Sequence, residues 1–165
     1  MIVVADSTPL IALARIGRLK LLKSLYGELI IPDAVFDEVV HSGKDRAGVT
    51  QVQKAEWIKR QSVDNEVAVQ LLRERLDRGE SEAIILALEL EADLLLIDEM
   101  KGRRIAEAQG IAVTGTVGAI VAAKRQNVID SVQPLLDDLR HNEFRLSDEL
   151  YKIALAMADE ENQDN

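Results

Sequence analysis

The sequence has no cysteine among its 165 residues. This absence excludes disulfides, thiolate metal sites and cysteine nucleophiles, and it suits a reducing compartment. No apolar stretch approaches the roughly 20 residues of a membrane-spanning helix, and the N-terminal segment lacks the basic start and long apolar region of a signal peptide. We therefore expect a cytoplasmic protein without membrane contact.

Basic and aromatic residues are also scarce. Lysine and arginine number 20 against 29 acids, which gives a net charge of −9, and aromatics make up 3% of the chain. Few aromatics leave little base stacking for nucleic-acid binding, and phosphate contacts would depend on local basic clusters rather than on the overall charge. The candidate clusters are Arg15/Arg18/Lys20, Lys59-Arg60, Arg103-Arg104 and Lys124-Arg125.

Several catalytic motifs are missing as well. The sequence has no HExxH or other paired histidines, no GxxxxGK[ST] loop and no GxGxxG turn. Histidine-based zinc sites, P-loop nucleotide binding and dinucleotide binding are therefore not expected. Ser7 has no evident histidine partner, which disfavours serine hydrolysis. Metal-assisted chemistry, in which a cation held by oxygen ligands activates water, is the class that remains.

Short apolar runs alternate with segments of helical periodicity. Runs at 2–5, 29–31, 94–97 and 112–113, with a weaker one at 57–58, predict buried strands. Because helices separate them, the pattern predicts a three-layer α/β/α domain with a central parallel sheet. Ser7 or Thr8 is expected to cap the first helix, with Pro9 in its first position.

One domain is expected over residues 1–158. It would comprise a core at 1–125 and a helical extension at 128–158, followed by a frayed tail at 159–165, where apolar residues are absent. The polar segment 41–50 contains two glycines and several charges, and it is expected to form a mobile loop or lid.

Acids stand at the ends of the predicted strands. Asp6 follows the first apolar run and Asp98 follows the run at 94–97, while Glu38 and the pair Glu80/Glu82 are expected near helix starts. Each acid could simply cap or flank a helix. If they converge at the carboxyl edge of the sheet, however, their repulsion requires a cation, and Mg²⁺ or Mn²⁺ prefers such oxygen ligands. Glu82 ranks slightly ahead of Glu80, since it precedes the apolar helix by one residue.

Five short motifs follow one another along the chain in a familiar order. They are DSTPLI at 6–11, IP followed by VFDEV at 31–39, GESEAI at 79–84, LIDE at 96–99, and TGTVG at 114–118 with Lys124 beyond it. In order and spacing they resemble the PIN domain, and more narrowly its small prokaryotic branch related to toxins of toxin–antitoxin modules. The resemblance covers residues 1 to about 125 and, loosely, the tail.

The resemblance implies an α/β/α fold and endonucleolytic cleavage of RNA that depends on Mg²⁺ or Mn²⁺. It places the acids of the site at Asp6, Glu38, Glu82 (or Glu80) and Asp98, with Glu99 as an additional ligand. It implies supporting or substrate-contacting roles for a further set of residues, Ser7, Thr8, Thr116, Arg103, Arg104 and Lys124. The chain departs from the commoner pattern by having glutamate at the third acidic position and Arg103-Arg104 where an aromatic is frequent.

The resemblance also implies partners. A basic antitoxin segment could occupy the acidic crevice, and a homodimer could form through the apolar tail residues Leu146, Leu150, Ile153 and Met157. Two alternatives stay open on the sequence alone. One is a non-catalytic PIN-like protein that binds nucleic acid or a partner, and the other is a receiver-like phosphoacceptor domain.

Overall fold

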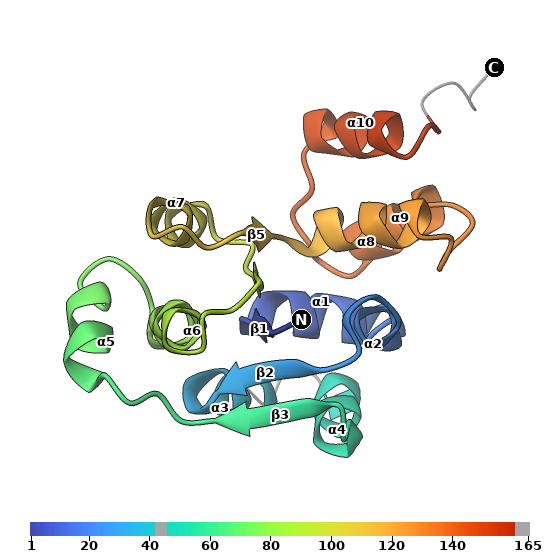
Figure 1. Ribbon diagram of the computed structural model, residues 1–165. Coiled ribbons are helices and arrows are strands. Elements are labelled where there is room, and N and C mark those ends of the chain that lie inside the picture. The colour runs from blue at the N-terminus through green and yellow to red at the C-terminus, as the bar shows by residue number, and fades with distance from the viewer. Residues whose placement is uncertain (42–45, 161–165) are drawn as a thin grey trace.

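The computed structural model describes residues 1–41 and 46–160. It contains five parallel strands in the order β3-β2-β1-β4-β5 (Figure 1). The strands are β1 (Val3–Ala5), β2 (Leu29–Pro32), β3 (Ile58–Gln61), β4 (Leu94–Leu96) and β5 (Val113–Thr114). Helices flank the sheet, which confirms the expected α/β/α architecture with a parallel sheet.

Ten helices are described around this sheet. They are α1 (Ser7–Arg15), α2 (Lys20–Tyr26), α3 (Asp33–His41), α4 (Arg46–Lys54), α5 (Glu66–Leu72), α6 (Arg78–Glu89), α7 (Met100–Ala108), α8 (Thr116–Arg125), α9 (Gln133–His141) and α10 (Asp148–Met157). None of them, within the described residues, is long and apolar enough to cross a membrane.

Strand β1 is the centre of the sheet. It pairs with β2 through Val4 and Ile30 on one side. On the other side all three of its residues pair with β4, where Val3 is in register with Leu94. All three are buried, because a middle strand with helices on both faces has no solvent side. Helix α6 lies against β1, β2 and β4 and is buried continuously from Gly79 to Ala87. The first turn of α6 is therefore held close to the end of β1.

Several local predictions differ from the structure. Helix α1 begins at Ser7 with Asp6 as its N-cap residue, so Pro9 is its third residue. Glu38 lies in the middle of α3 rather than near its start. Residues 46–50 of the expected lid belong to α4, because Val49 and Val52 recur at helical spacing and Val52 is buried in the core. The other residues of that expected lid beyond His41, 42–45, lie outside the described part of the chain.

The C-terminal helices pack beside the sheet and end in a buried acid. Helix α10 lies against α8 and stands at one extreme of the molecule (Figure 1). Glu160, expected in the frayed tail, is 2% exposed and accepts hydrogen bonds from Val132 N (2.8 Å) and Ser131 Oγ. The tail prediction is therefore wrong at Glu160, which binds the orphan amides at the start of α9; residues 161–165 are outside the described chain.

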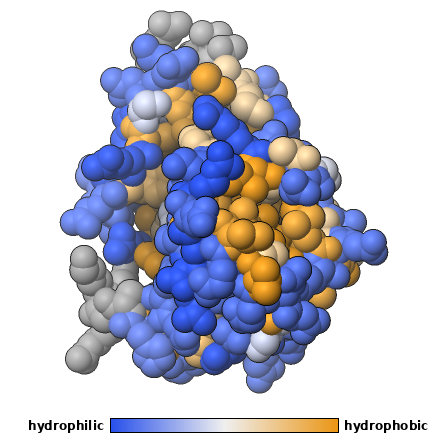
Figure 2. All heavy atoms as spheres, turned by 90° about the vertical axis from the view of Figure 1, so that its left-hand side faces the viewer, coloured by the Kyte–Doolittle hydropathy of each residue, from blue (hydrophilic) through white to orange (hydrophobic). Residues whose placement is uncertain are grey.

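Apolar side chains are exposed on the face that carries α5. Val67 and Leu71 are 72% and 65% exposed. Figure 2 looks onto this side of the molecule and shows apolar atoms gathered into a patch among hydrophilic ones.

Candidate active site

Asp6 lies where β1 ends and α1 begins. Its backbone N–H donates to the carbonyl of Leu96 (2.9 Å), which fixes the ends of β1 and β4 side by side. The Asp6 side chain is 3% exposed, and its Oδ1 has no hydrogen-bond partner among the described residues. Burial raises the pKa of Asp6 to about 7, and the negative charges of Glu38, Asp77 and Asp98 add to this effect.

Glu38 reaches the same region from the middle of α3. Ser7 Oγ donates to its Oε2 at 2.6 Å. A Cβ at Gly79 would overlap the Glu38 carboxylate, so this carboxylate lies directly against the backbone of the first turn of α6. Only glycine allows that approach. Burial raises the pKa of Glu38, with a further contribution from the charge of Asp77.

Asp77 and Glu80 form a reciprocal cap at the start of α6. Glu80 N donates to Asp77 Oδ1 (2.8 Å), and Asp77 N donates to Glu80 Oε1 (3.4 Å). This arrangement leaves Glu80 Oε2 buried and without a partner in the described structure. Burial, with the neighbouring Asp77 and the charge of Asp6, raises the pKa of Glu80 to about 8.

Glu82 makes structural hydrogen bonds with both of its carboxylate oxygens. It is 2% exposed, and its Oε1 accepts from the backbone N–H of Ala34 (3.2 Å) while Oε2 accepts from Arg78 Nε (2.8 Å). Ala34 is the second residue of α3, so Glu82 satisfies one of the unpaired amides at that helix start. Both carboxylate oxygens of Glu82 therefore have partners: the Ala34 hydrogen bond ties α6 to α3, and the Arg78 ion pair lies within α6.

Asp98 follows β4 and is oriented by the start of α8. Thr116 donates twice to it, from its backbone N–H to Oδ1 (2.8 Å) and from Oγ1 to Oδ2 (2.7 Å). A Cβ at Gly115 would lie 2.5 Å from Asp98 Oδ1, so this residue too must be small. Burial raises the pKa of Asp98, while the Thr116 hydrogen bonds and the charge of Arg103 oppose the rise.

Glu99 caps a helix, and the other polar candidates either are exposed or bind residues outside the acidic cluster. Glu99 is the N-cap of α7, where its carboxylate accepts from Gly102 N (2.6 Å). Thr8 and Arg104 are exposed. Lys124 lies away from the acids, since its Nζ donates to the carbonyl of Asp130 (2.5 Å) and is 3.6 Å from Glu160.

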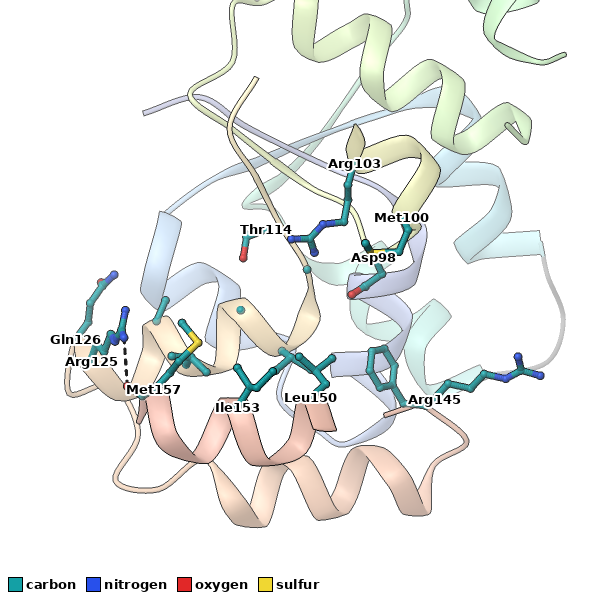
Figure 3. A pocket seen from close by; sticks show the side chains of 17 residues that line it. Asp98, Met100, Arg103, Thr114, Arg125, Gln126, Arg145, Leu150, Ile153 and Met157 are labelled. Carbon is teal, nitrogen blue, oxygen red and sulfur yellow. Dashed lines mark hydrogen bonds between the residues drawn. The ribbon is translucent and has the colours of Figure 1, made fainter. Parts of the chain in front are cut away.

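A groove of about 670 Å³ opens beside Asp98, between α8 and α10 (Figure 3). Arg103 extends over Asp98 from α7, and three apolar side chains of α10 (Leu150, Ile153, Met157) form the opposite wall. The groove is also lined by Met100, Arg125, Phe144 and Arg145. We call it the α8–α10 groove. Asp98 is the only acid that lines it among the described residues.

The structure thus brings together Asp6, Glu38, Glu80 and Asp98, and it adds Asp77, which the sequence argument missed. A capping-box pattern, Asp77-x-x-Glu80, was the signal that could have found it. In their present positions, no three acidic or histidine side chains of the described residues surround one point closely enough to chelate a metal ion. The two unpartnered buried oxygens, on Asp6 and Glu80, are nevertheless of the kind that a hard cation binds.

The site is thus that of a parallel α/β protein whose buried acids gather at the carboxyl edge of its sheet, where the acidic crevice is expected. A sequence model described as the PIN domain matches residues 2–160, and the chain therefore belongs to the PIN-domain family, a class whose fold is in general that of nucleases. Searches of curated proteins and of solved structures gave no match.

Proposed function

We propose that the protein is an endoribonuclease that depends on Mg²⁺ or Mn²⁺. The observation that carries the proposal is the pair of buried, unpartnered oxygens Asp6 Oδ1 and Glu80 Oε2. A buried polar atom without a partner is costly, and two carboxylates whose charges repel each other are the usual setting for a divalent cation.

In this proposal Asp6, Glu80 and Asp98 hold the cation, with Glu38 beside it. Glu80 takes the place that the sequence ranking gave to Glu82, because both oxygens of Glu82 already have partners. Glu99 likewise keeps its capping role at α7. When bound, the cation would supply Lewis-acid stabilisation of charge on the phosphate and a more acidic water.

The chain's own residues have definable tasks around this centre. Ser7 orients the Glu38 carboxylate, which is placed to accept a proton from water. Thr116 fixes both oxygens of Asp98. Arg103, which extends over Asp98, is placed to contact a phosphate oxygen at the mouth of the α8–α10 groove. Lys124 is not assigned such a contact, because its ammonium binds Asp130 O and Glu160.

We further propose that the protein is the toxin of a toxin–antitoxin pair. The supporting feature is the cluster of neighbouring acids, Asp6, Glu38 and Glu80, whose negative charge suits a basic antitoxin segment that brings its own cationic side chain to the carboxylates. A homodimer through α10 is proposed on its apolar residues, since Leu150, Ile153 and Met157 are 39%, 45% and 46% exposed.

Two other functions would require different properties of the protein. The order β3-β2-β1-β4-β5 differs from the 2-1-3-4-5 order of receiver-like folds, which disfavours a phosphoacceptor. A non-catalytic binding protein would keep the acids for structural reasons only. It would then show no metal dependence, whereas the proposed enzyme must bind Mn²⁺ through Asp6 and Asp98.

The decisive experiment is cleavage of a mixed RNA pool by purified protein in Mn²⁺, in EDTA, and with the variants Asp6→Asn and Asp98→Asn. Isothermal titration with Mn²⁺ accompanies the assay, with Asp138→Asn as the control because Asp138 is exposed on α9. We expect RNA cleavage only in Mn²⁺, and only by the wild-type protein and the Asp138→Asn variant. Wild-type cleavage rates in either site variant would overturn the proposal.

A further inference from the structure

A second groove lies at the opposite edge of the sheet from the acids. It measures about 710 Å³ and is lined by Lys20 and Lys23 of α2, Lys54 of α4, Lys59 of β3, and Trp57 just before β3. We call it the lysine groove. Leu29 N donates to the carbonyl of Trp57 (2.9 Å) at the amino ends of β2 and β3, and in a parallel sheet all amino ends share one edge. Figure 1 shows α2 and α4 together at this end.

The charge of this groove contrasts with that of the whole chain. The protein has eight lysines and a net charge of −9, yet four of the eight lysines line this one groove. Glu56 is the only acid in its lining among the described residues. Sequence clusters did not reveal the groove, because its lysines come from three elements, while the neighbouring Arg60 pairs with Asp33 (2.6 Å) instead.

The four lysines have no partners in the described structure. None of them takes part in a hydrogen bond or salt bridge with a described residue, and all four are exposed. Like charges gathered around one concave surface repel each other and concentrate anions from solution. The arrangement is therefore that of a groove prepared for a polyanion.

Trp57 indicates which polyanion. It is half-buried, packs against the core with one part, and lines the groove with the remainder. An indole ring beside four exposed ammonium groups suits a nucleic-acid strand, whose bases can stack on the ring while its phosphates contact the ammonium groups whatever the sequence. An acidic protein segment offers carboxylates but no bases to stack, so the tryptophan favours nucleic acid.

We propose that the lysine groove is an exosite that binds the backbone of single-stranded RNA away from the acidic crevice. As a site for RNA substrates it rests on the proposed nuclease function. It would hold a long RNA while a distant part of the same molecule reaches the acids. Long RNAs would then bind more tightly than short ones that fill only the crevice.

Trp57 is the only tryptophan of the chain, so its fluorescence reports directly on this groove. The test uses the Asp98→Asn protein in EDTA, which separates binding from cleavage. An unstructured RNA of roughly 20 nucleotides exceeds the roughly 4–16 nucleotides that a small domain covers. Titration with it should quench or shift Trp57 emission, with the same midpoint as anisotropy of the labelled RNA.

Paired variants identify the lysines. Lys20→Ala/Lys23→Ala and Lys54→Ala/Lys59→Ala should each weaken RNA binding about tenfold at low salt and reduce the salt slope by about 1.4, at about 0.7 per phosphate contact. Lys101→Ala/Lys152→Ala is the matched control, because both residues are exposed and outside the groove. It changes the net charge equally, and it should leave affinity and Trp57 emission unchanged.

Three outcomes would overturn the exosite. They are an unchanged Trp57 spectrum on saturation with RNA, equal losses in the control and groove variants, and tighter binding of poly-glutamate than of RNA, which would assign the groove to an acidic protein segment. Failure of the nuclease proposal is recognised separately, by absent Mn²⁺ binding and cleavage in the wild-type protein. The Mn²⁺ titration requires neither RNA binding nor the groove lysines, so it tests the metal site independently of the groove.

Discussion

The replacement Asp6→Asn separates stability from metal binding more sharply than other changes at the site. Asp6 is 3% exposed, and its pKa rises from 3.8 to about 7 mainly because of burial. The folded protein therefore binds a proton at Asp6 that the unfolded chain releases near pH 4. Between about pH 4 and pH 7 the free energy of unfolding falls as pH rises, and above pH 7 the loss is complete.

The size of this effect follows from the pKa. A change from 3.8 to about 7 corresponds to a loss of up to about 4 kcal/mol when Asp6 is ionised in the metal-free protein. Asparagine stays neutral, fits the same space and remains a good N-cap residue for α1. Metal-free Asp6→Asn should therefore be more stable than wild type at pH 8, by about 2 to 4 kcal/mol, and about equally stable at pH 4.

The measurement is urea denaturation in EDTA at pH 4, 6 and 8, followed by Trp57 fluorescence. In a parallel series without EDTA, free Mn²⁺ at about 100 times its Kd should stabilise wild type by about 2.7 kcal/mol and leave the variant unchanged. Asp138→Asn, an exposed replacement of the same kind, should follow wild type throughout. The reasoning fails if Asp6→Asn is less stable than wild type at pH 8 in EDTA, or if Mn²⁺ stabilises both proteins equally.

Three further changes probe neighbouring residues. Glu80→Gln should lower Mn²⁺ affinity at least about tenfold by calorimetry, whereas Glu82→Gln should leave metal affinity intact and reduce the free energy of unfolding by about 1 to 3 kcal/mol. Thr116→Val leaves the Asp98 carboxylate with only the hydrogen bond from the backbone N–H of residue 116. This change should weaken Mn²⁺ binding about tenfold in the same titration. Gly79→Ala places a methyl group against the Glu38 carboxylate, so the rate of RNA cleavage should fall. Circular dichroism at about 20 °C should still show a folded protein.

Each of these has a result that contradicts it. Equal Mn²⁺ affinities for Glu80→Gln and wild type would mean that Glu80 is not a metal ligand, and Glu82 would again be the candidate for the third acid. An unchanged Mn²⁺ affinity of the Thr116→Val variant would mean that the backbone N–H of residue 116 is sufficient to orient Asp98. Full activity of Gly79→Ala would show that Glu38 can move from α6 without consequence.

The sequence allowed the strand-end acids to be predicted because their positions depend on local patterns. Asp6 and Asp98 each end a short apolar run, and parallel strands necessarily bring such ends to one edge. The choice between Glu80 and Glu82 could not be made in this way. Residues two apart on a helix point to nearly opposite sides, and α6 is buried on all sides of its first turns, so hydrophobicity does not show which side meets β1.

Longer-range features were less predictable. Glu38 enters the site only because Gly79 lets α3 approach α6, a contact between distant segments. The burial of Glu160 depends on amides at the start of α9, which no tail composition indicates. The lysine groove needs α2, α4 and β3 in their folded places, and its residues are scattered in the chain.

The order of the strands also bears on how the protein is made. Strand β1 precedes the other four described strands in the chain and becomes the middle of the sheet. It stays open along one edge until β4 emerges and Val3 can pair with Leu94. Such distant pairing is slow and comes late in folding. Asp98, which directly follows β4 and Ile97, arrives in the same step, so the acidic crevice cannot be complete in a shorter nascent chain. A nascent chain from which β4 has not yet emerged therefore carries Asp6 without Asp98 beside it.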